Sequence, residues 1–199
     1  MSEKSAARLD CGKYGVLIVE ATEYGLALVT LEEGYKDSGK GRIKPSSTLD
    51  GLGISLRRMS AAELAEKSTS SLGSLKVADP KSFSKSAANL ICGFLSGDEA
   101  TYEKIKELPI DESALPKGFS GKVLKLLRHV PPGCYITYGD LAEAAGSPKA
   151  ARAVGAAMAS NPLLIAVPCH RVYGEGGRFT GFGGGLGLKA ALASLEEEN

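Results

Sequence analysis

The chain has 199 residues, 43% of them hydrophobic and 24% charged, with a formal net charge of +1. These values are typical of an ordinary globular protein with one large domain or two small ones. No apolar run is long enough to span a membrane, and residues 1–10 are too polar for a signal peptide. We therefore expect no membrane attachment and a cytoplasmic location, or a nuclear one in a eukaryote.

Charge is distributed unevenly along the chain. Residues 1–116 carry 15 Lys and Arg against 17 Asp and Glu, whereas residues 117–195 carry 9 against 3. A basic second half is compatible with a polyanionic partner but does not identify one.

The four cysteines are widely spaced and form no C-x-x-C pair. This spacing argues against a zinc ribbon and, in a reducing compartment, against a disulfide framework. With only two histidines in the chain, we expect no metal site. Cys92 lies within a helical pattern and is predicted to be a core residue.

The first half is predicted to be a small α/β domain. Its expected elements are a hairpin of two strands (14–20 and 25–31), a short helix (60–67), a second helix (82–95) and an extended piece (108–110). Ser60 and Glu63 fit a capping box for the short helix. We expect short strands and a mobile loop, 36–47, within the Gly-, Ser- and Lys-rich region 32–80. Prolines near 109–116 place a boundary between an N-terminal domain, 1–112, of ribonuclease-H-like outline and a C-terminal domain, 113–199.

The second half contains the pattern of a helix-turn-helix. A helix over 119–130 precedes Thr137 and Asp140, which fit a capping box for a helix through 141–145. Gly146 is placed to end that helix. Ser147 and Pro148 are then placed to start the next helix, over 149–160, as its N-cap and first residue. Antiparallel helix hairpins unrelated to DNA give the same pattern, so the helix-turn-helix is one of two interpretations.

The second of these helices consists almost entirely of small residues around Arg152. Tight helix packing explains small residues on one face, but here they occupy most faces. A bare helix with one long cation suits a narrow groove or a gap in a base stack.

The apolar run 163–167, closed by Pro168, predicts a buried strand or strand-like segment that leads to Cys169 and His170. A cysteine is nucleophilic only as the thiolate, and a nearby imidazole and arginine would raise the thiolate fraction. Neighbouring side chains of a strand point to opposite faces. Either the chain turns after Pro168, or a water carries the proton between sulfur and imidazole. The alternative is that Cys169 is a small buried core residue.

The glycine-rich stretch 173–185 follows, and then a helix from about 187 to 195. The stretch has no phosphate-loop motif, so we interpret it as a pocket wall with accessible backbone amides. Glu196 either belongs to a frayed acidic tail or faces inward as the carboxylate that orients His170.

Taken together, these residues resemble the O6-alkylguanine-DNA alkyltransferase family over roughly residues 82–196. The resemblance is carried by Tyr138, the string Lys149-Ala150-Ala151-Arg152-Ala153-Val154-Gly155, Asn161-Pro162, Pro168-Cys169-His170-Arg171-Val172, Gly184-Gly185-Leu186 and Lys189. It implies an α/β (α+β) fold in which a strand-rich N-terminal domain precedes a mainly helical C-terminal domain with the helix-turn-helix and the active cysteine.

The resemblance also implies roles for single residues. Cys169 corresponds to the alkyl acceptor, His170 to its base acting through water, and Glu196 to the carboxylate that orients the imidazole. Tyr138 corresponds to the phenol that hydrogen-bonds the leaving guanine, and Asn161 to the link between the helix-turn-helix and the active-site strand. Residues expected to contact substrate or DNA are Arg152, which would enter the base stack, Ala151, Gly155, Met158, Val172, Gly183 and Lys189.

The implied partner is double-stranded DNA carrying O6-alkylguanine, bound through the minor groove by a monomer that acts once and needs no cofactor. Activity on O4-alkylthymine stays open. Two positions depart from the family pattern: Gly183 replaces a frequent serine and Leu164 a frequent proline, and the zinc cysteines of some relatives are absent. Alternatives are a lesion sensor that transfers nothing, a helix-turn-helix regulator with a redox cysteine, and a cysteine hydrolase.

Overall fold

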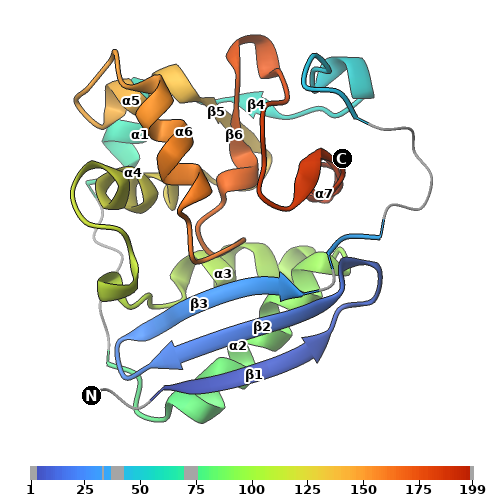
Figure 1. The fold of residues 1–199 in the computed structure, drawn as a ribbon, viewed down its shortest axis with the longest axis vertical. Coiled ribbons are helices and arrows are strands. Elements are labelled where there is room, and N and C mark those ends of the chain that lie inside the picture. The colour runs from blue at the N-terminus through green and yellow to red at the C-terminus, as the bar shows by residue number, and fades with distance from the viewer. Residues whose placement is uncertain (1–3, 33, 37–42, 70–75, 198–199) are drawn as a thin grey trace. The chain divides into compact units, whose positions relative to one another are not determined.

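The computed structural model describes residues 4–32, 34–36, 43–69 and 76–197. Contacts divide the chain into two compact units, a first unit (Met1–Lys36, Ser71–Leu115, Pro162–Ala166) and a second unit (Asp37–Ser70, Pro116–Asn161, Val167–Asn199). An N-terminal sheet and a helical C-terminal region confirm the predicted mixed α/β class (Figure 1). The division into domains 1–112 and 113–199 stays a prediction. No helix within the described residues is both long and apolar enough to cross a membrane.

The first unit is built on a three-stranded antiparallel sheet in the order β1-β2-β3. The predicted hairpin is confirmed as β2 (Val16–Thr22) and β3 (Gly25–Glu32). The edge strand β1 (Ser5–Asp10) was not predicted, because its inward positions hold only Ser5, Ala7 and Leu9, which give a weak apolar alternation. The first unit therefore has one more strand than the sequence indicated.

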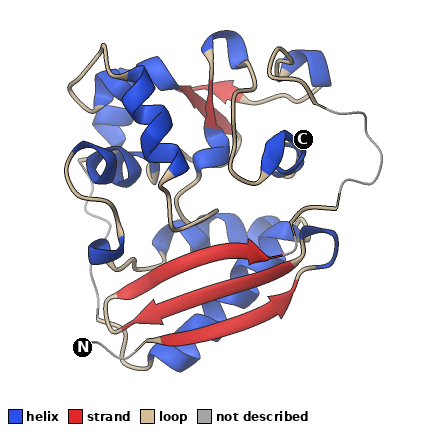
Figure 2. Cartoon of the chain, in the orientation of Figure 1, coloured by secondary structure: helices blue, strands red, loops and turns tan. Residues whose placement is uncertain are grey.

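Helix α2 (Pro80–Leu95) confirms the helix predicted over 82–95 and packs against β1 and β2. It starts where expected from local chemistry, since Asp79 accepts a hydrogen bond from the Lys81 amide and Pro80 occupies the first turn. A further helix, α3 (Tyr102–Glu107), follows. Figure 2 shows the helices of this unit on one face of its sheet.

Cys11 and Cys92 are paired, although their spacing in the sequence argued against a disulfide framework in a reducing compartment. They form a disulfide with a Cα–Cα distance of 5.6 Å, which links the end of β1 to α2. Cys92 is half-buried and not a core residue, because it lies on the side of α2 next to the chain that leaves β1. The sequence separation of 81 residues concealed this pair.

The second unit combines a small parallel sheet with helices. The sheet has the order β4-β5-β6, and the elements are β4 (Arg57–Arg58), α1 (Ala61–Lys67), α4 (Phe119–Leu127), β5 (Cys134–Thr137), α5 (Tyr138–Ala144), α6 (Ala151–Ala159), β6 (Val172–Tyr173) and α7 (Gly185–Ser194). The short helix predicted over 60–67 is confirmed with its capping box. The loop predicted over 36–47 falls in part outside the described residues.

The predicted helix-turn-helix is present as α5 and α6, which pack against each other and against α4. Gly146 (φ +78°) ends α5 as predicted, with the Ser147 amide donating to the Ala142 carbonyl and the Gly146 amide to Glu143. These two bonds are those of a Schellman motif.

Two details of this motif differ from prediction. Ser147 and Pro148 do not start the second helix, because the Ala150 amide donates to the Ser147 carbonyl and closes a turn, so α6 begins at Ala151. Thr137 caps α5 by accepting from the Asp140 amide, as predicted. The Asp140 carboxylate, however, accepts from the Thr137 hydroxyl and not from its backbone.

Candidate active site

The chain that leads to Cys169 is not the predicted strand. Within 163–167 there is no continuous strand, and Leu163 forms an isolated parallel bridge with Val29 of β3. Ile165 has φ +71°, and the Ala166 amide donates across it to the Leu164 carbonyl at 2.9 Å. This is a γ-turn with positive φ, a rare and strained conformation for a β-branched residue. The run is buried as predicted, but the turn interrupts it.

A second tight turn presents the thiol. The Cys169 amide donates to the Val167 carbonyl at 2.8 Å across Pro168 (φ −80°, ψ 66°), which makes an inverse γ-turn. One turn of 3-10 helix, Cys169–Arg171, follows immediately. Of the two alternatives drawn from the sequence, the chain thus turns after Pro168, and the side chain of Cys169 is only 6% exposed.

Asn161 lies beside this turn, as the sequence predicted. Its side-chain Nδ2 donates to the Val167 carbonyl at 2.9 Å and so joins the residue after α6 to the chain before the thiol. Its side chain also hydrogen-bonds Cys169. Burial raises the pKa of the Cys169 thiol, while the Asn161 hydrogen bond and the charge of Lys189 oppose this rise. The thiol is therefore held protonated until a base removes its proton.

His170 and Glu196 are brought together, although 26 residues separate them. His170 Nε2 lies 2.9 Å from Glu196 Oε1, and both side chains are buried. Glu196 follows α7 in a turn and is 3% exposed, so it is not part of a frayed tail. Burial lowers the pKa of His170 and the Glu196 charge opposes this shift, so the imidazole is neutral at pH 7. Since Nε2 faces Glu196, Nδ1 is the ring nitrogen that can accept a proton from sulfur.

Arg171 corrects one expectation. The sequence suggested an arginine that promotes the thiolate, but Arg171 binds Glu196 instead, with Nε 2.9 Å from Oε2 and Nη2 2.7 Å from Oε1. Its Nη1 donates to the Val130 carbonyl. Burial alone would raise the pKa of Glu196, but the charges of Arg171 and His170 lower it to about 2. Glu196 is thus ionised at neutral pH.

The cation that does act on the thiol is Lys189, predicted as a substrate or DNA contact. Lys189 is fully buried, its Nζ donates to the Val172 carbonyl at 2.5 Å, and it lies 4.3 Å from the centre of the Tyr173 ring. Burial lowers its pKa to about 8, and the nearby Cys169 opposes this shift. At pH 7 a buried ammonium therefore favours a negative charge on the sulfur.

Tyr138, the first residue of α5, has a partner that was not predicted. The Thr180 hydroxyl donates to Tyr138 Oη at 2.7 Å, which leaves the phenolic hydrogen to point elsewhere. Burial raises the pKa of Tyr138, so the phenol stays protonated and can donate. A Cβ built on Gly155 would lie 4.0 Å from Tyr138 Cε1, so α6 passes close to this ring.

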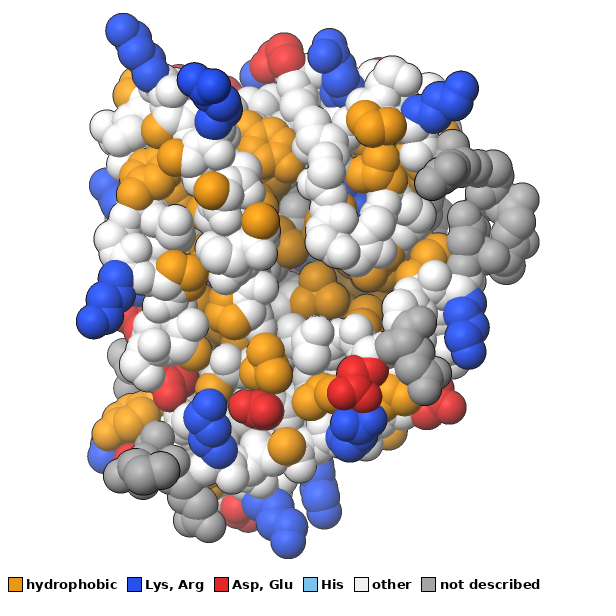
Figure 3. Space-filling model, viewed as in Figure 1, with side chains coloured by type: hydrophobic (Ala, Val, Ile, Leu, Met, Phe, Trp, Pro, Cys, Tyr) orange, Lys and Arg blue, Asp and Glu red, His pale blue; other side chains and the backbone are white. Residues whose placement is uncertain are grey.

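The expected DNA contacts on α6 are arranged around its outer face. Arg152 is exposed, whereas Ala151, Gly155 and Met158 are partly buried. Figure 3 shows the surface over α6 as mainly hydrophobic and backbone atoms with little charge. Among the expected substrate contacts, Val172 is fully buried in β6, and Gly183 is exposed with open space around its Cα.

Of the residues singled out in the sequence, the structure brings His170 and Glu196 into contact, and the sequence did not predict the Arg171–Glu196 ion pair or the Thr180–Tyr138 hydrogen bond. Arg171 follows the Cys-His pair directly in the sequence. Thr180 is the one hydroxyl side chain besides Tyr173 within 173–185, but nothing in the sequence indicates its partner. Within the described part of the chain, no cluster of three or more His, Cys, Asp or Glu could hold a metal ion.

Comparison with known proteins places this site in a family. Residues 118–198 match the model of the 6-O-methylguanine DNA methyltransferase DNA-binding domain. The methylated-DNA–protein-cysteine methyltransferase of Mycobacterium bovis is 39% identical over 119 residues, which are 60% of this chain and 68% of that protein. Its counterpart in Methanosarcina mazei is 40% identical over 121 residues, which are 60% of this chain and 72% of that protein.

Solved structures agree over nearly the whole chain. The Mycobacterium tuberculosis OGT in complex with DNA superposes with a TM-score of 0.61 at 26% identity, covering 96% of this chain and 91% of that one. Sequence and fold therefore agree with the resemblance found in the motifs, and the chain belongs to the methylated-DNA–protein-cysteine methyltransferase family.

Proposed function

We propose that this protein repairs DNA directly, by moving an alkyl group from O6 of guanine to Sγ of Cys169 once per molecule. The observation that carries the proposal is the set of groups around one buried thiol: a neutral imidazole backed by a carboxylate, a buried ammonium and a protonated phenol. The relatives named methylated-DNA–protein-cysteine methyltransferases support the same activity.

We propose a part in the reaction for each of these groups. The Cys169 proton moves to His170 Nδ1, directly or through a water, and Glu196 stabilises the imidazolium that forms. The sulfur then attacks the alkyl carbon, an S–C bond forms and the C–O6 bond breaks. The electron pair of that bond stays with guanine, and the hydrogen bond from Tyr138 makes guanine a better leaving group. The product is a thioether that water does not hydrolyse readily, so each molecule acts once.

The alkylated base must leave the duplex to reach the sulfur. Extrusion of a nucleotide costs a few kcal/mol and is easiest for a damaged pair. We propose that α6 enters the minor groove and that exposed Arg152 fills the gap in the stack, since small side chains let the helix approach closely. We further propose that the protein acts as a monomer inside the cell and that O6-alkylguanine is the lesion it takes.

A lesion sensor or regulator that transfers nothing is the competing function. The thiol and its acid–base partners are all present, and the named relatives are methyltransferases, so the comparisons support transfer. A cysteine hydrolase, the other alternative, would release its product and regenerate the thiol, so one molecule would act repeatedly.

Intact-protein mass spectrometry on a duplex with one O6-methylguanine tests the proposal. We expect one methyl group on Cys169, no second turnover, and no modification of the Cys169→Ser variant. An unmodified protein that nevertheless binds the lesion tightly would establish the sensor instead. Repeated demethylation by one molecule would contradict the single-turnover mechanism.

A further inference from the structure

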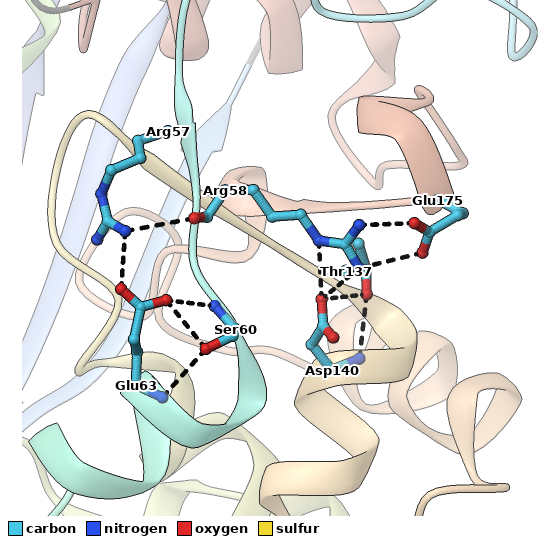
Figure 4. A network of polar contacts seen from close by, with 7 residues as sticks. All are labelled: Arg57, Arg58, Ser60, Glu63, Thr137, Asp140 and Glu175. Carbon is cyan, nitrogen blue, oxygen red and sulfur yellow. Dashed lines mark hydrogen bonds and ion pairs between the residues drawn. The ribbon is translucent and has the colours of Figure 1, made fainter.

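Two adjacent arginines in β4 hold two different parts of the second unit (Figure 4). Arg57 Nη1 lies 2.8 Å from Glu63 Oε1, and Glu63 completes the capping box of α1 with Ser60. Arg58 points to the other side, toward Asp140 and Glu175. Arg57 and Arg58 can therefore be compared as matched positions of one strand, since both side chains are exposed and both are bound to carboxylates.

Arg58 binds its two carboxylates through three nitrogens, and Nη2 donates to both Asp140 and Glu175. Its Nε and Nη2 lie 3.2 and 3.0 Å from Asp140 Oδ2, and its Nη1 lies 2.6 Å from Glu175 Oε1. Asp140 belongs to the first turn of α5, and Glu175 lies in the glycine-rich stretch that follows β6. One guanidinium therefore joins the start of α5 to the glycine-rich stretch.

These are the two segments that meet at Tyr138. Asp140 Oδ2 accepts from the Thr137 hydroxyl at 2.7 Å, and Thr137 directly precedes Tyr138. On the other side, Thr180 of the glycine-rich stretch donates to Tyr138 Oη. Arg58 and the Tyr138–Thr180 bond therefore connect the same two segments at different points.

We propose that Arg58 is a positioning residue for alkyl transfer, which fixes the spacing between α5 and the glycine-rich stretch so that the Tyr138 hydroxyl is aimed at the leaving guanine. The inference rests on the proposed function. Stretch 173–185 is rich in glycine and needs restraint from outside, since glycines restrict the backbone least.

The location of Arg58 separates positioning from folding stability. Its side chain is 42% exposed and that of Glu175 is 72% exposed. Exposed ion pairs contribute little to the free energy of unfolding. Reaction rates, by contrast, respond strongly to small displacements of a reacting group. Loss of Arg58 should therefore change the rate much more than the stability.

The main test compares Arg58→Ala with Arg57→Ala. Three quantities are measured: the single-turnover rate constant on saturating O6-methylguanine duplex, the affinity for that duplex, and the thermal midpoint. We expect Arg58→Ala to slow transfer by about 3- to 10-fold with unchanged affinity and midpoint, and Arg57→Ala to change the rate less than about 2-fold. Arg58→Lys should recover part of the rate, because lysine keeps the charge but cannot bridge both carboxylates as a planar fork.

A double-mutant cycle with Tyr138→Phe tests the route of the effect. If Arg58 acts through the phenol, Arg58→Ala slows the wild type but adds nothing in the Tyr138→Phe background. If Arg58→Ala slowed transfer equally in the wild-type and Tyr138→Phe backgrounds, the proposal would be overturned. It would also be overturned if Arg57→Ala lowered the rate constant as much as Arg58→Ala does. A loss confined to DNA affinity would overturn it as well, because it would make Arg58 a phosphate contact. If the wild type itself did not become methylated on Cys169, the proposed function would be refuted, which is a different outcome from any difference between the variants.

Discussion

At the scale of single residues, the proposed acid–base chemistry depends on the ionisation of Glu196. Two cationic or potentially cationic neighbours, Arg171 and His170, hold a buried carboxylate ionised with a pKa of about 2. The carboxylate in turn binds Nε2 of His170, so a proton taken up by the ring would go to Nδ1. Glu196 therefore influences both the orientation and the charge of His170, the proposed general base.

Glu196→Gln tests this dependence. The amide keeps a similar shape but cannot stabilise an imidazolium, so we expect transfer to slow by roughly 10- to 100-fold with nearly unchanged DNA affinity. Single-turnover rates and binding isotherms on the same duplex measure the two effects. The neighbouring Glu197→Gln is the control, because Glu197 binds the Ser55 amide outside this cluster. Equal rates for both variants and the wild type would remove Glu196 from the mechanism.

The same carboxylate makes stability depend on pH. Its pKa is about 2 when folded against an ordinary value of 4.5, so the unfolded chain binds the proton more readily. The ionised group thus stabilises the fold by about 3 kcal/mol above pH 4.5. This contribution is lost as the pH falls from 4.5 through 2. We therefore expect the free energies of unfolding of the wild type and Glu196→Gln, measured in urea between pH 2 and 6, to become similar toward pH 2.

At the scale of elements, most predictions from local signals are confirmed, and one exception is the start of α6, where Ser147 and Pro148 form a turn before the helix. The Ser60 capping box and Gly146 act through residues within one turn, and both are confirmed. The strand predicted over 163–167 is wrong because hydrophobic periodicity carries no information on a positive φ at Ile165. That turn is held from a distance, by a bond from the Leu164 amide to the Val29 carbonyl.

In the candidate site, too, residues within a short string were easier to predict than contacts between residues far apart in the sequence. Cys169 and His170 were recognisable from a short string, and the inward orientation predicted for Glu196 is what the structure shows. The role of Thr180 could not be predicted, because its partner Tyr138 is 42 residues away. The same is true of Arg58, which lies 82 residues from Asp140 and 117 from Glu175.

The strained turn at Ile165 can be tested by comparing the stabilities of two variants that differ by a single methyl group. Ile165→Gly and Ile165→Ala both remove the buried side chain, but only alanine keeps a Cβ that disfavours φ +71°. We expect the glycine variant to be more stable than the alanine variant by roughly 1 kcal/mol, the reverse of their usual order. Chemical denaturation of the two variants measures the difference. An alanine variant that is as stable as the glycine variant would show that the turn is not strained.

At the scale of the whole molecule, the two units are interleaved along the chain. Residues 37–70 belong to the second unit although they lie between parts of the first, and Pro162–Ala166 belongs to the first unit although it lies between parts of the second. The Cys11–Cys92 disulfide closes a loop of 81 residues that includes β4 and α1 of the second unit. The cross-link therefore restricts the unfolded state of segments from both units.

Removal of this cross-link should destabilise the protein without changing its chemistry. For a loop of this length, chain entropy predicts a loss of about 4 kcal/mol in the free energy of unfolding for Cys11→Ser/Cys92→Ser. The free cysteines Cys134 and Cys169 are unchanged in this variant, so transfer below its unfolding transition should proceed at the wild-type rate. A thiol reductant should lower the unfolding midpoint of the wild type toward that of the variant and leave the variant unaffected. If reductant did not change the unfolding midpoint of the wild type, Cys11 and Cys92 would not be cross-linked in solution. If the variant transferred the alkyl group more slowly than the wild type, the first unit would contribute to catalysis.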